Sequence, residues 1–126
     1  MKFEHLFECA PEDTTYFALT FPFSYSDCQS LIDEYEKQFR DNTNIYFHRE
    51  LLVNSLEGRR IDLLTITANN DATELTEDPL PGLFPEALSR PKRFNKPVVF
   101  ITARVHPGET QGSYMMNGLL SFLLNE

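Results

Sequence analysis

Two segments of the chain repeat apolar residues at the three- and four-residue spacing of an amphipathic helix. The first follows a stretch in which Ser24 with Asp27, or Ser26 with Gln29, can form a capping box. Its apolar positions are Leu31, Ile32, Tyr35 and Phe39. The second runs from Glu109 to Leu124 and carries Met115, Met116, Leu119, Leu120, Leu123 and Leu124. The spacing predicts two helices, each with one face that packs against other elements.

Three segments in the first half of the chain are typical of β-strands. Tyr16–Phe21 is rich in aromatic residues and stops at Pro22, where a ladder would lose a donor. The runs Ile45–Asn54 and Arg59–Thr67 flank a short segment that contains Gly58. This arrangement predicts an isolated strand followed by an antiparallel hairpin.

A fourth β-type segment, Pro97–Ala103, is an unbroken apolar run, which is typical of a strand buried on both faces of a sheet. We expect Val98–Ala103 to pair with the hairpin strand around Ile61–Thr67. The helix from Glu109 to Leu124 would then cover this sheet. Together the elements predict an α/β fold class.

The segment between the hairpin and this apolar run, Ala68–Lys96, holds four prolines and shows no sustained period, which predicts a long surface loop. Acidic residues come first in the loop and basic residues follow. The basic residues are Arg90, Lys92, Arg93 and Lys96. A solvated loop explains this charge pattern, and attraction of an acidic protein tail is the alternative.

The composition fits one domain, because 126 residues with 41% hydrophobic content supply enough apolar material for a modest core. The formal net charge of −8 repels nucleic acid phosphates and anionic lipid. The acidic start, Met1–Thr15, has no apolar run typical of a signal peptide. Cys9 and Cys28 lack a CxxC spacing, which favours free thiols in a reducing compartment. We therefore expect a soluble, cytoplasmic protein.

The strongest candidate for chemistry is the turn His106-Pro107-Gly108-Glu109, between the predicted buried strand and the last helix. The carboxyl ends of strands are where open α/β sheets place ligands. An imidazole and a carboxylate three residues apart can point at one metal ion, and the helix dipole keeps Glu109 ionised. The alternative is a loop histidine beside an ordinary first-turn acid. His106 and Glu109 are the predicted zinc ligands.

Residues Arg104–Thr110, with the sequence RVHPGET, resemble the metal-binding signature of the cytosolic carboxypeptidases. This is the tubulin-deglutamylating branch of the zinc metallocarboxypeptidase family. Tyr16–Gln29 looks like the join between that branch's amino-terminal β-sandwich and its catalytic domain. Tyr46–Leu52 and Arg60–Thr67 are similar to its opening hairpin. The resemblance implies that residues 1–23 are the remnant of a β-sandwich domain. Residues 24–126 would then begin a zinc carboxypeptidase domain, the start of its mixed sheet with helical cover.

The same resemblance assigns the first histidine ligand to His106 and the glutamate ligand to Glu109, with no catalytic residue in this chain. The third ligand, the groups that bind the substrate carboxylate and the general base are expected beyond Glu126. His5 and His48 do not replace them. We thus expect a fragment truncated at both ends, inactive on its own.

The implied parent protein is a zinc-dependent carboxypeptidase that removes C-terminal or branch glutamates from acidic protein tails such as those of tubulin. Its partners would be such tails, with no nucleic acid and no membrane. The oligomeric state, and any association with microtubules or the nucleus, stay open. The alternatives are an inactive fragment or truncated binding module, and a zinc deacylase of the aspartoacylase type. Tyr16–Gln29 argues against the deacylase, which lacks a preceding sandwich.

Overall fold

A computed structural model describes residues 2–8, 10–86 and 90–125 of the chain. The elements follow in the order α1 (Tyr25–Phe39), β1 (Ile45–Asn54), β2 (Arg60–Ala68), β3 (Ala72–Thr76), β4 (Lys92–Phe94) and α2 (Thr110–Leu124). Strands β1 and β2 form one antiparallel sheet, and β3 and β4 form another. The predicted α/β class is confirmed, as two helices with two small antiparallel sheets.

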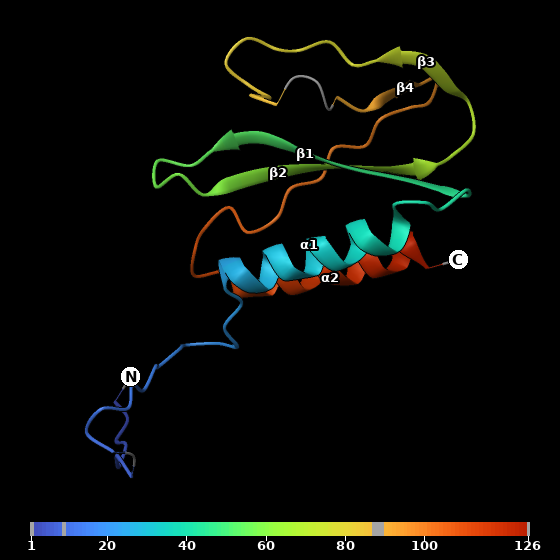
Figure 1. The fold of residues 1–126 in the computed structure, drawn as a ribbon. Helices are drawn as coiled ribbons and strands as arrows, with labels where there is room; N and C mark the ends of the chain where they lie inside the picture. Colours follow the sequence, from blue (N-terminus) through green and yellow to red (C-terminus); the bar gives the residue numbers. More distant parts are fainter. Residues whose placement is uncertain (1, 9, 87–89, 126) are drawn as a thin grey trace.

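The elements form layers, with the β1–β2 hairpin between the helices on one side and β3 and β4 on the other (Figure 1). Helices α1 and α2 lie side by side, and the hydroxyls of Tyr35 and Ser121 join them at 3.0 Å. Phe39 of α1 stacks on Phe47 of β1 with 6.3 Å between ring centroids. The buried hydrophobic side chains come from both helices, β1 and the connection after β3. They are Ile32, Phe39, Leu51, Phe84, Leu120 and Leu124.

Helix α1 begins with a complete capping box. The backbone N–H of Asp27 donates to the Ser24 hydroxyl, and the backbone N–H of Ser24 donates to the Asp27 carboxylate. The backbone N–H and the hydroxyl of Ser24 both donate to the Asp27 carboxylate, and these two bonds lower the pKa of Asp27. Of the two predicted caps the structure uses Ser24 with Asp27, because Ser24 directly precedes the first helical residue and Asp27 lies at the third helical position.

The predicted hairpin is confirmed, with a register that pairs Ile45 with Ala68 and Asn54 with Arg60. The register shifts between Leu51 and Val53, which marks a bulge in β1. Gly58 adopts a φ of 74° in the connecting turn, a conformation that favours glycine. The helix predicted from Glu109 is also confirmed, since α2 begins at Thr110 with Glu109 as its N-cap residue.

The expectation of a structureless loop over Ala68–Lys96 is wrong in part. Within it β3 and β4 pair antiparallel, with Ala72 opposite Phe94 and Thr76 opposite Lys92. The two strands are short and fifteen residues apart, so neither shows a readable alternation. The sequence therefore indicated the proline-rich connection between the two strands but not the pairing of the strands themselves.

The predicted buried strand Val98–Ala103 is wrong for the part of the chain that the structure describes. The segment belongs to no strand there, and Val98, Val99 and Phe100 are 90%, 80% and 75% exposed. Its predicted pairing with Ile61–Thr67 is absent among the described residues, where β2 pairs with β1 alone. Tyr16–Phe21 likewise forms no strand. A β-type sequence becomes a strand only where another edge accepts its hydrogen bonds, and neither segment meets one here.

Candidate metal centre

The predicted ligands lie in the turn between the exposed apolar run and α2, and both His106 and Glu109 are exposed. The N–H of Glu109 donates to the carbonyl of His106 at 3.1 Å, which closes the turn. The N–H of Gly112 donates to the carbonyl of Glu109 at 3.0 Å, which joins the turn to the first turn of the helix. The two side chains therefore project from a backbone fixed by its own hydrogen bonds. The carboxylate of Glu109 sits at the helix start, where the macrodipole favours negative charge.

Arg104 precedes this turn in the sequence and stabilises it through hydrogen bonds from its side chain. Its guanidinium donates to the carbonyl of Pro107 from Nη2 at 2.8 Å and from Nε at 3.2 Å. Its Nη1 donates to the carbonyl of Phe23, just before the cap of α1. Arg104 has a φ of 56°, in the left-handed region that few non-glycine residues adopt. The sequence pattern did not reveal this role, because a positive φ at an arginine leaves no signal in residue spacing.

The segment before α1 also contacts the start of α2. The hydroxyls of Thr20 and Thr110 lie 2.6 Å apart, and the Tyr114 hydroxyl donates to the carbonyl of Pro22 at 2.8 Å. Between the two segments is an open cavity of about 300 Å³. Its lining is Ala18, Leu19, Thr20, Pro22, Phe23, Ser24, Arg104, Gly108 and Thr110. The turn His106–Glu109, which carries the predicted ligands (the ligand turn), is thus packed with its flanking residues against residues some 80 to 90 positions earlier in the sequence.

The donor types in the turn fit zinc, since an imidazole nitrogen and a carboxylate oxygen are both zinc ligands. A structural or catalytic zinc site uses three or four protein ligands. Within residues 2–8, 10–86 and 90–125, no three His, Cys, Asp or Glu side chains gather where they could hold a metal. His106 and Glu109 on their own would supply only two of the ligands that such a site needs. His48 is on β1, where its ring stacks on that of Tyr46, and His5 packs against Phe7 and Phe17.

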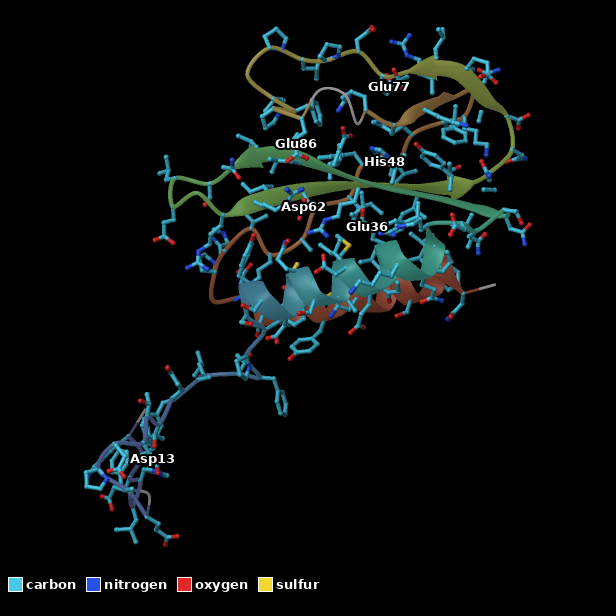
Figure 2. The ribbon with its side chains drawn as sticks, in the orientation of Figure 1. Asp13, Glu36, His48, Asp62, Glu77 and Glu86 are labelled. Atoms are coloured by element: carbon cyan, nitrogen blue, oxygen red, sulfur yellow. The ribbon has the colours of Figure 1, made fainter. Side chains whose placement is uncertain are left out.

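A second polar cluster, which includes Asp62 and Glu36, lies between the hairpin and α1 (Figure 2). Arg49 of β1 donates to Asp62 at 3.0 Å, to Glu36 at 3.3 Å and to Asp33. Gln29 donates to Asp62 at 3.1 Å. Burial opposes ionisation of Asp62, but the hydrogen bonds from Arg49 and Gln29 outweigh it and lower the pKa of this carboxyl. The cluster joins the helix to the sheet.

Cys28 is a half-buried free thiol on α1. Burial raises its pKa, and the negative charge of Asp62 acts in the same direction. The thiol is therefore protonated at neutral pH and poorly nucleophilic. The other cysteine considered from the sequence, Cys9, lies outside the described residues.

The basic residues in and around β4 are mostly engaged by their own chain. Arg90 pairs with buried Glu50 at 2.6 Å and stacks over Phe84, with 3.5 Å from its Cζ to the ring centroid. Arg93 pairs with Asp78 at 2.7 Å. The Lys96 ammonium donates to Thr67, Asn70 and the carbonyl of Ala68. These contacts favour a structural role for the cluster over attraction of an acidic tail.

Comparison with known proteins places these features in context. The model of the zinc carboxypeptidase family matches residues 28–126. The chain is 45% identical to human cytosolic carboxypeptidase-like protein 5 over 134 residues, which cover 98% of this chain and 15% of the relative. It is 41% identical to the Danio rerio protein of the same name, covering 90% of this chain and 14% of that relative.

A more distant similarity links the chain to human cytosolic carboxypeptidase 6. The two are 35% identical over 126 residues, which cover 100% of this chain and 20% of that protein. The chain thus spans 14 to 20% of the length of these relatives. Across the residues that the structure describes, no helix has the length and apolarity needed to cross a membrane.

Proposed function

Because this chain belongs to the zinc carboxypeptidase family, we propose that it supplies two zinc ligands, His106 and Glu109, to a metallocarboxypeptidase. The observation that carries the proposal is the turn itself. It presents an exposed imidazole and an exposed carboxylate from a backbone closed by hydrogen bonds, directly before a helix. The turn also lies within the region that the family model matches.

Zinc bound at such a site polarises the scissile carbonyl and lowers the pKa of its bound water to about 7. The residues of this chain hold and orient the ion. His106 offers a neutral nitrogen and Glu109 a negative oxygen, and both must be deprotonated to bind, so metal binding weakens in acid. The hydrogen bond from its N–H to the His106 carbonyl restricts how far the two side chains can separate.

We assign the remaining machinery to parts of the protein outside these 126 residues. That machinery comprises a third ligand, a general base and the groups that bind the substrate carboxylate. Hydrolysis by a zinc peptidase requires three protein ligands with an open position for water. The described residues bring only His106 and Glu109 to this turn. The isolated chain is accordingly expected to bind zinc weakly and to hydrolyse nothing.

The proposed substrates are glutamates at the C-termini or branch points of acidic protein tails, such as those of tubulin, in the cytoplasm. Support comes from the motif Arg104–Thr110 and from the names of the relatives, which are cytosolic carboxypeptidases. The basic residues Arg90, Arg93 and Lys96 are held by internal contacts. Recognition of an acidic tail is therefore assigned to surfaces other than this cluster.

The test is glutamate release from a polyglutamate-tailed peptide by the full-length protein that contains this chain. His106→Ala and Glu109→Ala should each reduce the rate by more than about 100-fold, the upper range for loss of an outer-shell partner. They should also lower the zinc content of the purified protein. His5→Ala and Glu34→Ala, at exposed positions outside the turn, serve as matched controls and should leave both quantities unchanged. Full activity and full zinc content in the Glu109→Ala protein would refute the assignment.

A further inference from the structure

Arg104 makes an unusual set of contacts for an arginine two residues before a proposed metal ligand. All the hydrogen bonds that its side chain makes with described residues end on main-chain carbonyls, those of Pro107 and Phe23. Pro107 lies between the two proposed ligands, and Phe23 precedes α1. One planar guanidinium thus joins the ligand turn to a distant segment, a geometry that a lysine with a single ammonium cannot reproduce.

The backbone of Arg104 is also constrained. Its φ of 56° is a conformation that favours glycine, yet the chain places an arginine there. The same residue that adopts this conformation donates two side-chain hydrogen bonds to the carbonyl of Pro107. The contact is therefore built by the backbone as well as by the side chain.

Helix α2 packs directly on this residue. A Cβ added at Gly112 would lie 3.1 Å from the backbone nitrogen of Arg104 and 3.4 Å from its Cα. The glycine thus lets the first turn of the helix approach the main chain of Arg104. The ligand turn is held at its start by Arg104, at its end by Gly112, and internally by the bond from Glu109 to His106.

We propose that Arg104 is a positioning residue of the metal centre, which holds the turn in the one arrangement that brings His106 and Glu109 to the same ion. The inference rests on the function proposed above. Partners that orient metal ligands typically contribute 10- to 100-fold in metal affinity or activity. Arg104 acts through the carbonyl of Pro107, so its loss frees the turn without removing a ligand.

The test uses the full-length protein that contains this chain, with two substitutions of the arginine. Arg104→Ala removes the guanidinium and keeps a Cβ at the positive φ. Arg104→Gly removes the guanidinium and suits the positive φ. If the side chain positions the turn, both variants weaken zinc affinity, measured by competition with a chromophoric chelator, by about 10- to 100-fold. Arg59→Ala is the matched control, because that arginine is exposed and pairs with a neighbour in sequence, Glu57.

Two further readouts separate positioning from general stability. In the metal-free protein, the amides of Glu109 and Gly112 should exchange hydrogen faster in the Arg104 variants, while the amides of β1 and β2 keep their wild-type rates. The visible absorption of the Co²⁺-substituted protein should change in the Arg104 variants and stay unchanged in Arg59→Ala. If Arg104→Ala fails to fold, Arg104→Lys and Gly112→Ala replace it. Arg104→Lys should weaken zinc affinity because a single ammonium cannot reproduce the contacts of the guanidinium. Gly112→Ala should weaken it because the added Cβ would lie 3.1 Å from the backbone nitrogen of Arg104.

The outcomes distinguish this inference from the proposed function. If His106→Ala loses zinc while the Arg104 variants bind zinc with wild-type affinity and an unchanged Co²⁺ spectrum, Arg104 does not position the site. If His106→Ala itself keeps wild-type zinc affinity, the proposed function fails, and the inference fails with it. Weakened affinity and faster exchange confined to the ligand turn support the role of Arg104.

Discussion

Asp62 and Asp33 allow a sharp test of how the hairpin is fixed to α1, because both pair with the same guanidinium of Arg49. The side chain of Asp62 is 2% exposed, whereas that of Asp33 is 51% exposed. The perturbation is Asp→Asn at each position in turn. It removes the charge, keeps the size, and presents an amide N–H₂ to donors that need an acceptor.

The expected magnitude follows from the bonds that each carboxylate accepts. Asp62 accepts from Arg49 at 3.0 Å and from Gln29 at 3.1 Å, both largely shielded from water, and from the more exposed Arg60. Hydrogen bonds to a charged group contribute about 1.5 to 3 kcal/mol each. The two shielded bonds, at the lower value, predict a loss of about 3 kcal/mol for Asp62→Asn. An exposed ion pair contributes at most about 1 kcal/mol, which bounds the effect of Asp33→Asn.

The assay is native-state hydrogen exchange of the full-length protein that contains this chain, read by mass spectrometry on peptides from β1 and β2. A loss of about 3 kcal/mol corresponds to exchange roughly 100-fold faster, because about 1.4 kcal/mol is a factor of ten. Asp33→Asn should change the rate by less than about five-fold. Equal effects at the two positions, or a larger effect at Asp33, would show that burial does not set the strength of these contacts.

Three further outcomes are expected. The pKa of Asp62 is lowered in the folded protein, so its stabilising effect is present above about pH 4 and is lost as pH falls through the folded value; Asp62→Asn should flatten the acid limb of a stability curve. Cys28, whose pKa burial raises, should react with a disulfide reagent at pH 7 far more slowly than free cysteine, and equal rates would contradict its environment. The 126-residue chain expressed alone should aggregate through Val98, Phe100 and Phe122, whereas light scattering from a monodisperse monomer would disprove this.

Local patterns predicted the parts of this fold that depend on neighbours in the sequence. The capping box at Ser24 and the hairpin turn at Gly58 follow from side chains a few residues apart, and both are present. The strand expected at Val98–Ala103 depended on a partner edge that the pattern could not supply, and it is exposed instead. The β3–β4 pair, in contrast, is present but was not predicted, because strands of three to five residues carry too little periodicity to be recognised.

The residues of the candidate site also differ in whether the sequence alone could identify them. His106 and Glu109 could be selected from four consecutive residues, and whether they bind zinc stays a prediction. Arg104 could not be selected, because its role depends on a backbone angle and on the carbonyl of Phe23, 81 positions away. The cluster from Arg90 to Lys96 looked like a basic surface, and only the structure reveals its internal partners. A sequence shows which residues are charged, but it does not show which distant residues pair with them in the folded chain.

The connection between β3 and β4 is held at two points along its length. The N–H of Phe84 donates to the carbonyl of Leu52 at 2.8 Å, and Arg90 pairs with Glu50, so the fifteen residues between the strands are anchored to β1. Closing a flexible loop loses entropy that grows with its length, by about 0.6 kcal/mol for each doubling. Asp78 pairs with Arg93 of β4, so with these anchors only the chain from Pro79 to Leu83 closes as a short loop of its own. Evolution can therefore lengthen or shorten that exposed stretch at little thermodynamic expense, while β4 and the ligand turn that follows it keep their places.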